Sequence, residues 1–394
     1  MKRNWEYKKL GDVASFRRGL TYAKDDVVNH SSKIVLRSNN INLETSSLNF
    51  DDVVCLRDDF VIPLDKLLRG GDIFICMSNG STQHLGKVAH VQENLNMAFG
   101  GFMGVIEPNE NLTYSRYVFY CCRSGAYRSY LNSIFNGANI NNLKWGDLSK
   151  FVIPVPPLSE QSRIVAELDL LTGIIDKQNA QLKELNSLAQ AIFYDMFGDP
   201  IENPKGWEVK KLGDVCDVRD GTHDSPDYVE DGYPLVTSKN VVDGKISFEN
   251  VNYINEADFI SISKRSKVDD GDIIMPMIGT IGKPVIVSKT REFAIKNVAL
   301  IKFYEDGSVM NVFIRSIISS DSFDAYMKTK NKGGTQKFIA LGDIRKLNIP
   351  VPPLSLQQSF AEKIQSIEKQ KETFRASIAD TQKLLDYTMD KYFG

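Results

Sequence analysis

Residues 153–159 read IPVPPLS, and the same seven letters return at residues 349–355. Prolines at this density cannot continue a helix, so each copy predicts an extended segment that ends whatever precedes it. A long stretch poor in glycine and proline follows each copy, and we expect Ser159 and Ser355 to be the N-caps of helices there. The repeated heptapeptide therefore predicts two long helices, each preceded by the same extended segment.

Apolar residues in both stretches follow the spacing of a coiled-coil seam. In the first stretch the 4-3-4-3 spacing is unbroken, and the seam consists of Ile164, Leu168, Leu171, Ile175, Gln178, Leu182, Leu185, Ala189, Ile192 and Met196. In the second stretch the seam consists of Ile364, Ile367, Phe374, Ile378 and Leu385, interrupted by Lys371, Thr381 and Thr388. Helices packed only on their own domains would also show stripes, but the length and strict period favour two helices that pair with each other. At ~1.5 Å per residue, the first helix would be about 58 Å long.

Further repeats lie outside the two helices, in constant order. Residues 5–13 read WEYKKLGDV and residues 207–215 read WEVKKLGDV, while the tripeptide GDI occurs at residues 71–73 and 271–273. The offset between copies falls only from 202 (207 − 5) to 196 (349 − 153). The chain is therefore two homologous halves that differ by short loop insertions.

The repeat predicts an α+β protein with a pseudo-two-fold internal repeat: two tandem β-rich domains separated by two long antiparallel coiled-coil helices. Short β-like runs with Gly-Asp turns fill the first part of each half. The expected divisions are a first β-rich domain in 1–152, a linker and spacer helix in 153–200, a second β-rich domain in 201–348 and a second linker and helix in 349–394. The first helix leads from domain one to domain two, so a symmetry-related second helix must return.

Composition excludes several classes of protein. The 394 residues are 42% hydrophobic, and no run approaches the ~20 apolar residues of a membrane span or the apolar region of a signal peptide, so we expect a cytoplasmic protein. The five cysteines form no CxxC pair, which favours reduced core thiols. The net charge of −2 lacks the basic excess typical of nucleic-acid binding, although basic loops can lie on an acidic body.

Signatures of catalysis are missing from the sequence. It contains neither an Asn/Asp-Pro-Pro-aromatic methyltransferase motif nor a GxGxxG after a strand. Residues 80–87 (GSTQHLGK) resemble a phosphate-binding loop, but five residues separate the glycines and Val88 replaces the hydroxyl that would bind magnesium. The four histidines show no metal-ligand spacing. We therefore predict no catalytic residue, no cofactor and no metal site.

Taken together and in order, these motifs resemble the specificity subunits of Type I restriction–modification enzymes. The resemblance covers nearly the whole chain and includes Gly-Lys pairs at residues 86–87 and 282–283 and the run GGTQKF at residues 333–338. It implies that each β-rich domain is a target recognition domain reading one half of a split, asymmetric site in double-stranded DNA. It implies that the helices set the half-site spacing and dock two methyltransferase (modification) subunits. Methylation, and cleavage by motor/endonuclease (restriction) subunits, would belong to partners.

Candidate DNA contacts are loop side chains that can pair with base edges or phosphates, such as Arg with guanine and Asn or Gln with adenine. The candidates are Arg17, Arg18, Arg37, Asn39, Asn40, Ser78, Asn79, Ser81, Thr82, Gln83, His84, Asn139 and Asn141 in the first half, and Arg219, Thr222, His223, Lys239, Asn240, Thr280, Lys330, Lys332, Thr335, Gln336 and Lys337 in the second. Residues 328–337 carry four lysines and no acid, whereas their counterpart, residues 132–141, carries no charge. Loops this different would suit two different half-sites, although such residues are also common in solvated turns.

Two other classes of protein remain open from the residues alone. A structural adaptor with two interaction domains on a coiled-coil spacer would bind proteins and no nucleic acid, and the near-neutral charge favours it. The Asn-, Gln- and Lys-rich loops argue against it. A catalytic enzyme is disfavoured by the missing motifs.

Overall fold

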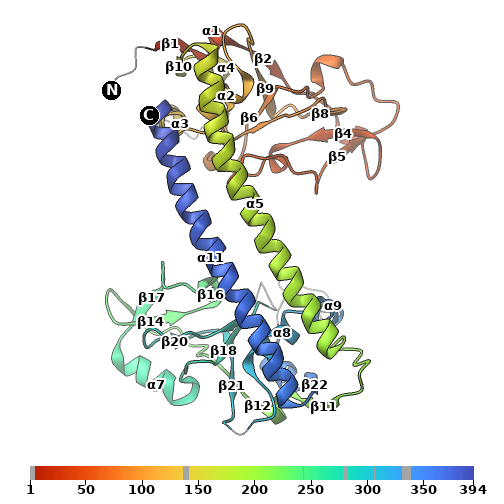
Figure 1. Cartoon of the computed structure of the whole chain (residues 1–394), viewed down its shortest axis with the longest axis vertical. Coiled ribbons are helices and arrows are strands. Elements are labelled where there is room, and N and C mark those ends of the chain that lie inside the picture. The colour runs from red at the N-terminus through yellow and green to blue at the C-terminus, as the bar shows by residue number, and fades with distance from the viewer. Residues whose placement is uncertain (1–4, 136–141, 243, 278–282, 306, 331–338) are drawn as a thin grey trace. The chain divides into compact units, whose positions relative to one another are not determined.

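The computed structural model describes residues 5–135, 142–242, 244–277, 283–305, 307–330 and 339–394 (Figure 1). The chain forms two compact units, one of Met1–Gln178 with Ala376–Gly394 and one of Asn179–Arg375. Each unit contains a β-rich globular part and one half of each long helix. The predicted fold class, two β-rich modules with two long helices, is confirmed.

The first unit contains two four-stranded sheets. One has the order β2 (Ala14–Arg18), β9 (Met103–Pro108), β6 (Ile73–Cys76) and β7 (Val88–His90), and the other has the order β3 (Val27–Val28), β5 (Val54–Leu56), β4 (Lys33–Leu36) and β8 (Met97–Phe99). All neighbouring strands are antiparallel except β4 and β8. Every residue of β6 is buried, which matches the uninterrupted apolar run that follows the Gly-Asp turn.

The second unit repeats this topology. One sheet has the order β12 (Cys216–Asp220), β21 (Val298–Phe303), β18 (Ile273–Pro276) and β19 (Val285–Ile286), and the other has the order β13 (Tyr228–Val229), β17 (Asn252–Ile254), β14 (Tyr233–Val236) and β20 (Ala294–Ile295). Again the one parallel pair is the equivalent one, β14 with β20. A small hairpin, β15 (Val241–Val242) with β16 (Lys245–Ile246), is added.

The two repeated sequence motifs of each half are strand partners. β1 (Glu6–Lys9) pairs antiparallel with β10 (Val152–Val155), and β11 (Glu208–Lys211) pairs with β22 (Asn348–Val351). Each is a two-stranded ribbon, an edge position where a proline inside the strand removes no central ladder bond. The ribbon therefore joins the start of each half to the segment that introduces the long helix.

Shorter helices cover the sheets. In the first unit they are α1 (Leu10–Val13), α2 (Ser115–Cys121), α3 (Gly125–Phe135) and α4 (Trp145–Leu148), with single 3-10 turns η1 (Lys24–Asp26), η2 (Ser38–Asn40), η3 (Leu64–Lys66) and η4 (Thr82–His84). In the second they are α6 (Leu212–Val215), α7 (Glu256–Ser266), α8 (Asn311–Ile318), α9 (Asp321–Lys330) and α10 (Leu341–Arg345), with η5 (Ser238–Asn240).

The two long helices are α5 (Leu158–Phe197) and α11 (Leu354–Phe393), each of 40 residues. The expected N-caps Ser159 and Ser355 are wrong, because each helix begins at the leucine before the serine and the serine is already its second residue. The carbonyl of Pro157 already accepts the N–H groups of Glu160 (2.9 Å) and Gln161 (3.0 Å), so the proline is the last residue outside the helix.

A buried glutamine attaches each long helix to the globular part of its unit. Gln161 is fully buried, and its Oε1 accepts the N–H of Tyr114 at 3.0 Å. Its Nε2 donates to the carbonyls of Leu112 (2.9 Å) and Pro156 (2.8 Å). Gln357 makes the equivalent three bonds in the second unit, at 2.9, 2.9 and 2.8 Å.

Within each unit the two long helices pack against each other in opposite directions. In the first unit, Ile164 and Leu168 near the start of α5 share one core cluster with Leu385 and Met389 near the end of α11. In the second unit, Phe193 and Phe197 near the end of α5 contact Phe360 near the start of α11, with ring centroids 5.8 and 5.2 Å apart. The antiparallel helix pair is therefore built into both cores.

The predicted seam residues differ in burial along the helices. Those in the buried class are Ile164, Leu168, Ile364, Ile367 and Leu385, together with the interrupting Lys371 and Thr388. Those in the half-buried class are Leu171, Ile175, Gln178, Leu182, Leu185, Ala189, Ile192, Met196, Phe374, Ile378 and Thr381. The polar position Gln178 donates through Nε2 to Ser377 Oγ on α11 at 2.7 Å. Burial is thus most complete near the globular part of each unit.

Two further findings bear on the class of protein. Within the described ranges, no helix combines the length and apolar character needed to span a bilayer. Four cysteines are buried and Cys55 is half-buried, and all five are free thiols.

Candidate nucleic-acid interface

A pocket of about 960 Å³ opens in the first unit where loops at the ends of several strands meet. The loops following β2, β4, β6 and β8 contribute residues 20–22, 37–39, 78–80 and 100–102, and Asp52 precedes β5. The sequence brings these loops together because the strands belong to two adjoining sheets. Loops positioned by a rigid scaffold are where binding side chains are concentrated.

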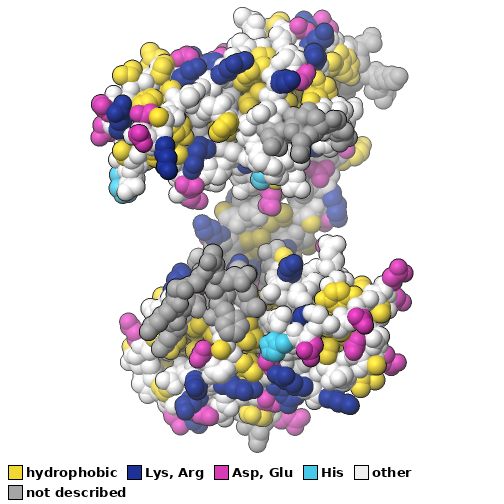
Figure 2. Space-filling view, turned by 180° about the vertical axis from the view of Figure 1, so that it is seen from behind, with side chains coloured by type: hydrophobic (Ala, Val, Ile, Leu, Met, Phe, Trp, Pro, Cys, Tyr) yellow, Lys and Arg dark blue, Asp and Glu magenta, His cyan; other side chains and the backbone are white. Residues whose placement is uncertain are grey.

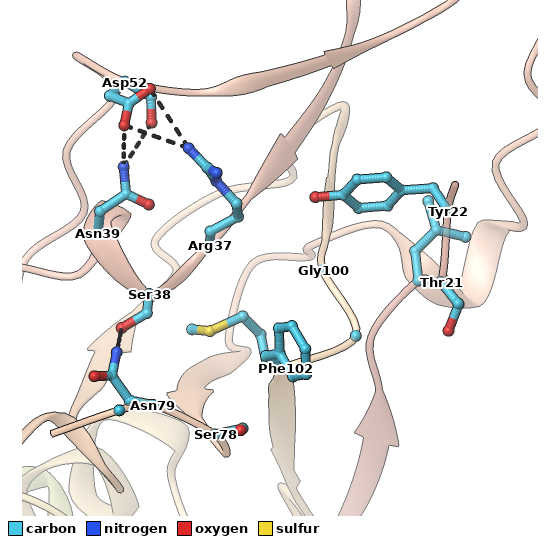
Figure 3. Close-up of a pocket in the computed structure, with 14 residues that line it drawn as sticks. Thr21, Tyr22, Arg37, Ser38, Asn39, Asp52, Ser78, Asn79, Gly100 and Phe102 are labelled. Atoms are coloured by element: carbon cyan, nitrogen blue, oxygen red, sulfur yellow. Dashed lines mark hydrogen bonds and ion pairs between the residues drawn. The ribbon is translucent and has the colours of Figure 1, made fainter. Parts of the chain in front are cut away.

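Polar side chains line one wall of this pocket. Asn39 donates from Nδ2 to Asp52 Oδ2 at 2.7 Å, and Arg37 Nη2 lies 3.3 Å from the same oxygen. Figure 3 shows these three residues together, with the Asn39 side-chain oxygen directed away from Asp52. Asn79 donates from Nδ2 to Ser38 Oγ at 2.9 Å. The wall thus holds amide, guanidinium and carboxylate groups in place, the groups that read base edges.

The second unit presents different chemistry at the equivalent loops. After β14, Thr237 and Lys239 occupy the positions that Arg37 and Asn39 occupy in the first unit. The equivalence is shown by the same hydrogen bond in both turns, in which the side-chain oxygen of Asn40 or Asn240 accepts the backbone N–H of Arg37 or Thr237. After β12, the ring of His223 lies between Asp220 Oδ2 (2.8 Å) and Asn297 Oδ1 (2.9 Å). One scaffold therefore carries two different sets of polar side chains.

Three of the predicted DNA contacts form hydrogen bonds within the protein. Asn40 and Asn240 are buried, and their side-chain oxygens close the turn after β4 or β14 through bonds of 2.7 and 3.0 Å. Arg17 is almost covered and binds Asp72, whose pKa is raised by burial, as well as the carbonyl of Leu67 at 2.9 Å. The sequence alone does not show that the polar atoms of these three residues are used inside the protein, and their DNA contacts remain predictions.

The other predicted contacts divide into three groups. Those at the pocket are Arg37, Asn39, Ser78 and Asn79. Those elsewhere among the described strands, turns and loops are Arg18, Ser81, Thr82, Gln83 and His84 in the first unit and Arg219, Thr222, His223 and Lys239 in the second, all exposed or half-buried. Those outside the described residues are Asn139, Asn141, Thr280, Lys332, Thr335, Gln336 and Lys337, together with the side chain of Lys330. Their DNA contacts remain predictions.

Sequence reasoning missed several lining residues of the first-unit pocket, among them Tyr22, Asp52 and Phe102. The predicted contacts were basic, amide, hydroxyl and imidazole side chains, so they included no phenyl or phenol ring and no acid. One signal was available for Phe102, which follows two glycines and belongs to a three-residue turn between strands where the second unit has only two residues.

Charge is mixed over the exposed surface. Figure 2 shows Lys and Arg side chains interspersed with Asp and Glu on this face of each unit. Among the described residues, no group of three or more His, Cys, Asp or Glu side chains is placed to hold a metal ion. The candidate interface therefore rests on loop geometry rather than on a uniformly basic face.

Comparison with known proteins decides the family. A model described as the Type I restriction modification DNA specificity domain matches residues 2–187 and again residues 204–379. The chain belongs to this family. Its two matches coincide with the two halves of the internal repeat, so each half of this specificity protein is one family domain.

Individual members of the family match from about half of the chain to nearly all of it. The EcoKI specificity subunit of Escherichia coli is 25% identical over 385 residues, which cover 92% of this chain and 82% of that protein. The StySPI specificity subunit of Salmonella potsdam is 31% identical over 184 residues, 46% of this chain and 39% of that protein. The solved S subunit of a Type I restriction–modification system from M. genitalium covers 100% of this chain and 97% of its own, with 12% identity and a TM-score of 0.57. This last similarity is one of fold.

Proposed function

We propose that this specificity protein is the non-catalytic, sequence-reading subunit of a Type I restriction–modification complex. Each recognition domain reads one half of a split, asymmetric DNA site, and separate subunits methylate and cleave the DNA. The observation that carries the proposal is one fold present twice with different side chains at equivalent loops, such as Asn39 and Lys239. A duplicated scaffold suits a bipartite site, and unequal loops suit unequal halves.

Methylome sequencing tests this function directly. Co-expression with a methyltransferase partner should produce one methylated sequence made of two different specific parts separated by a gap. The variants Asn39→Ala and Lys239→Ala, which change exposed residues at equivalent positions, form a matched pair. Each should relax the sequence requirement in one part only, because base contacts are local and each bidentate pair supplies roughly 1–3 kcal/mol of discrimination. Methylation without a split site would refute the proposal.

The partners that we propose are double-stranded DNA, two methyltransferase subunits docked on the helices α5 and α11, and a restriction subunit, acting in the cytoplasm. A gel shift with and without the methyltransferase separates this function from that of a protein-only adaptor. DNA binding that depends on sequence supports the specificity subunit. A complex that binds the methyltransferase but never binds DNA supports the adaptor.

The continuous helices supply a spacer whose length can be changed. Inserting one heptad into α5 between Leu171 and Leu185, and one at the matching place in α11, keeps the seam in phase and lengthens each helix by roughly 10 Å. The preferred gap between half-sites should grow by about three base pairs at ~3.4 Å each. An unchanged gap in an active complex would contradict the role of the helices as a spacer.

A further inference from the structure

Phe102 is an exposed aromatic residue on a rigidly held turn. Its side chain is 73% exposed, yet its carbonyl accepts two N–H groups, those of Met77 and Ser78, at 3.0 Å each. The same turn is closed by Met103 N–H donating to the Gly100 carbonyl at 2.8 Å. The neighbouring chain approaches so closely that a Cβ on Gly19 would lie 1.9 Å from the Gly100 oxygen. The backbone is therefore fixed while the ring is presented to solvent, where a flat apolar group of a ligand can reach it.

Phe102 lines the first-unit pocket together with groups of nucleobase-reading chemistry. Figure 3 shows Phe102 in the same pocket as Arg37, Asn39 and Asp52 on one side and the half-buried Tyr22 on the other. A protein that reads only base edges in a groove needs side chains that project from its surface. A cavity of about 960 Å³ with an aromatic face beside amide and guanidinium groups is instead the size and chemistry that hold a nucleotide.

We propose that this pocket receives one nucleobase displaced from the duplex stack, with its face against Phe102 and its hydrogen-bonding edge against Arg37 and Asn39. The inference rests on the proposed function, because it assumes that the first domain binds DNA. It goes further by naming a stacking residue and a deformation of the DNA. The displaced base lies in the half-site read by the first domain.

The second unit has no aromatic residue at the equivalent turn. The strand that ends there, β20, is followed by Lys296 and Asn297 only, and Asn297 Oδ1 is engaged by His223. The amide of Asn297 supplies no stacking face, so the proposal applies to one half-site and not to the other. The duplicated chain thus provides its own comparison.

The experiment places 2-aminopurine, whose fluorescence rises when it leaves the stack, at successive positions of both half-sites. In the complex with the methyltransferase, one position in the first half-site should brighten in addition to the adenine that is methylated. Phe102→Ala should abolish that signal and weaken binding by roughly 5- to 150-fold, the effect of losing one base–aromatic stack. Phe102→Trp should retain the signal, while Phe102→Leu should lose most of it because a leucine has no stacking face.

The matched control is Tyr7→Ala, which removes another exposed aromatic side chain (63%) of the same unit, on β1 and outside the pocket. It should leave the signal and the affinity unchanged. The inference is overturned if the complex methylates a split site while every position except the methylated adenine stays quenched, or if Phe102→Ala binds as the unaltered protein does. A complex that shows no split site at all refutes the proposed function instead, so the two failures are distinguishable.

Discussion

Replacing Gln161 by leucine tests how the long helix is attached to the first recognition domain. The leucine fills a similar volume, so the change removes polar contacts without opening a large cavity. Three hydrogen bonds are lost, and the N–H of Tyr114 and the carbonyls of Leu112 and Pro156 lose the partner that the glutamine supplied. At about 0.5–1.5 kcal/mol net per bond, the free energy of unfolding of the first unit should fall by about 2–4 kcal/mol.

Urea denaturation combined with hydrogen exchange measures this loss unit by unit. Exchange should quicken in peptides of the first unit and stay unchanged in those of the second. Gln357→Leu should give the mirrored result, because it removes the same three bonds from the second unit. Gln178→Leu is the graded control, since this half-buried glutamine on the same helix donates one bond, to Ser377, and should cost about 1 kcal/mol. A Gln161→Leu protein within about 0.5 kcal/mol of the unaltered one would refute the reasoning.

Three other predictions concern the cores and the loop arginines. Burial, together with the charge of Arg116, lowers the pKa of His90 to about 4, so the folded state favours the neutral imidazole. The corresponding part of the free energy of unfolding is present above pH ~6.5 and is lost as the pH falls through 4. Acidification should therefore lower the free energy of unfolding of the unaltered protein by about 3 kcal/mol more than that of His90→Gln, as acid titration of unfolding can measure. Phe360 is fully buried, so Phe360→Ala should lower the free energy of unfolding by about 3–5 kcal/mol, as calorimetry can measure. Phe374 is only half-buried, so Phe374→Ala should lower it by clearly less, and equal losses would contradict the idea that burial sets the cost. Arg17→Ala should lower the free energy of unfolding of the first unit by about 3 kcal/mol, because it leaves Asp72 without its ion-pair partner. Arg18→Ala changes an exposed residue and should leave this free energy unchanged, while the slope of log binding constant against log salt concentration should flatten by ~0.9. The reverse pattern would show that the roles of the two arginines are exchanged.

The fold was predictable because it is written twice. Repeats such as residues 153–159 and 349–355 fix the order of elements, and the seam spacing identifies both long helices. The N-cap of each helix was placed two residues too late, because the sequence does not show that the carbonyl of Pro157 would be the first acceptor. The parallel pairing of β4 with β8 joins distant segments and has no local signal.

The candidate site was predictable only in part. The sequence identified the polar loops, and the pocket brings together four of the predicted residues, Arg37, Asn39, Ser78 and Asn79. Composition could not separate these from Arg17 and Asn40, because whether a polar group faces solvent or a buried carboxylate depends on residues far away in the chain. Aromatic contacts such as Phe102 escaped for a related reason, since an exposed phenylalanine looks like core in a sequence.

The first unit is assembled from two separate stretches of the chain, and this has a consequence for synthesis on the ribosome. Its core takes Leu385, Met389 and Phe393 from the last helix, whereas the second unit is a contiguous stretch, Asn179–Arg375. A nascent chain emerges from its N-terminus, and domains generally fold as units in that order. Here the order is reversed: the segment made second can close first, and the segment made first must wait, with part of its apolar surface uncovered, until α11 has been made. A chain that stops early would therefore damage the domain farthest from the stop in sequence.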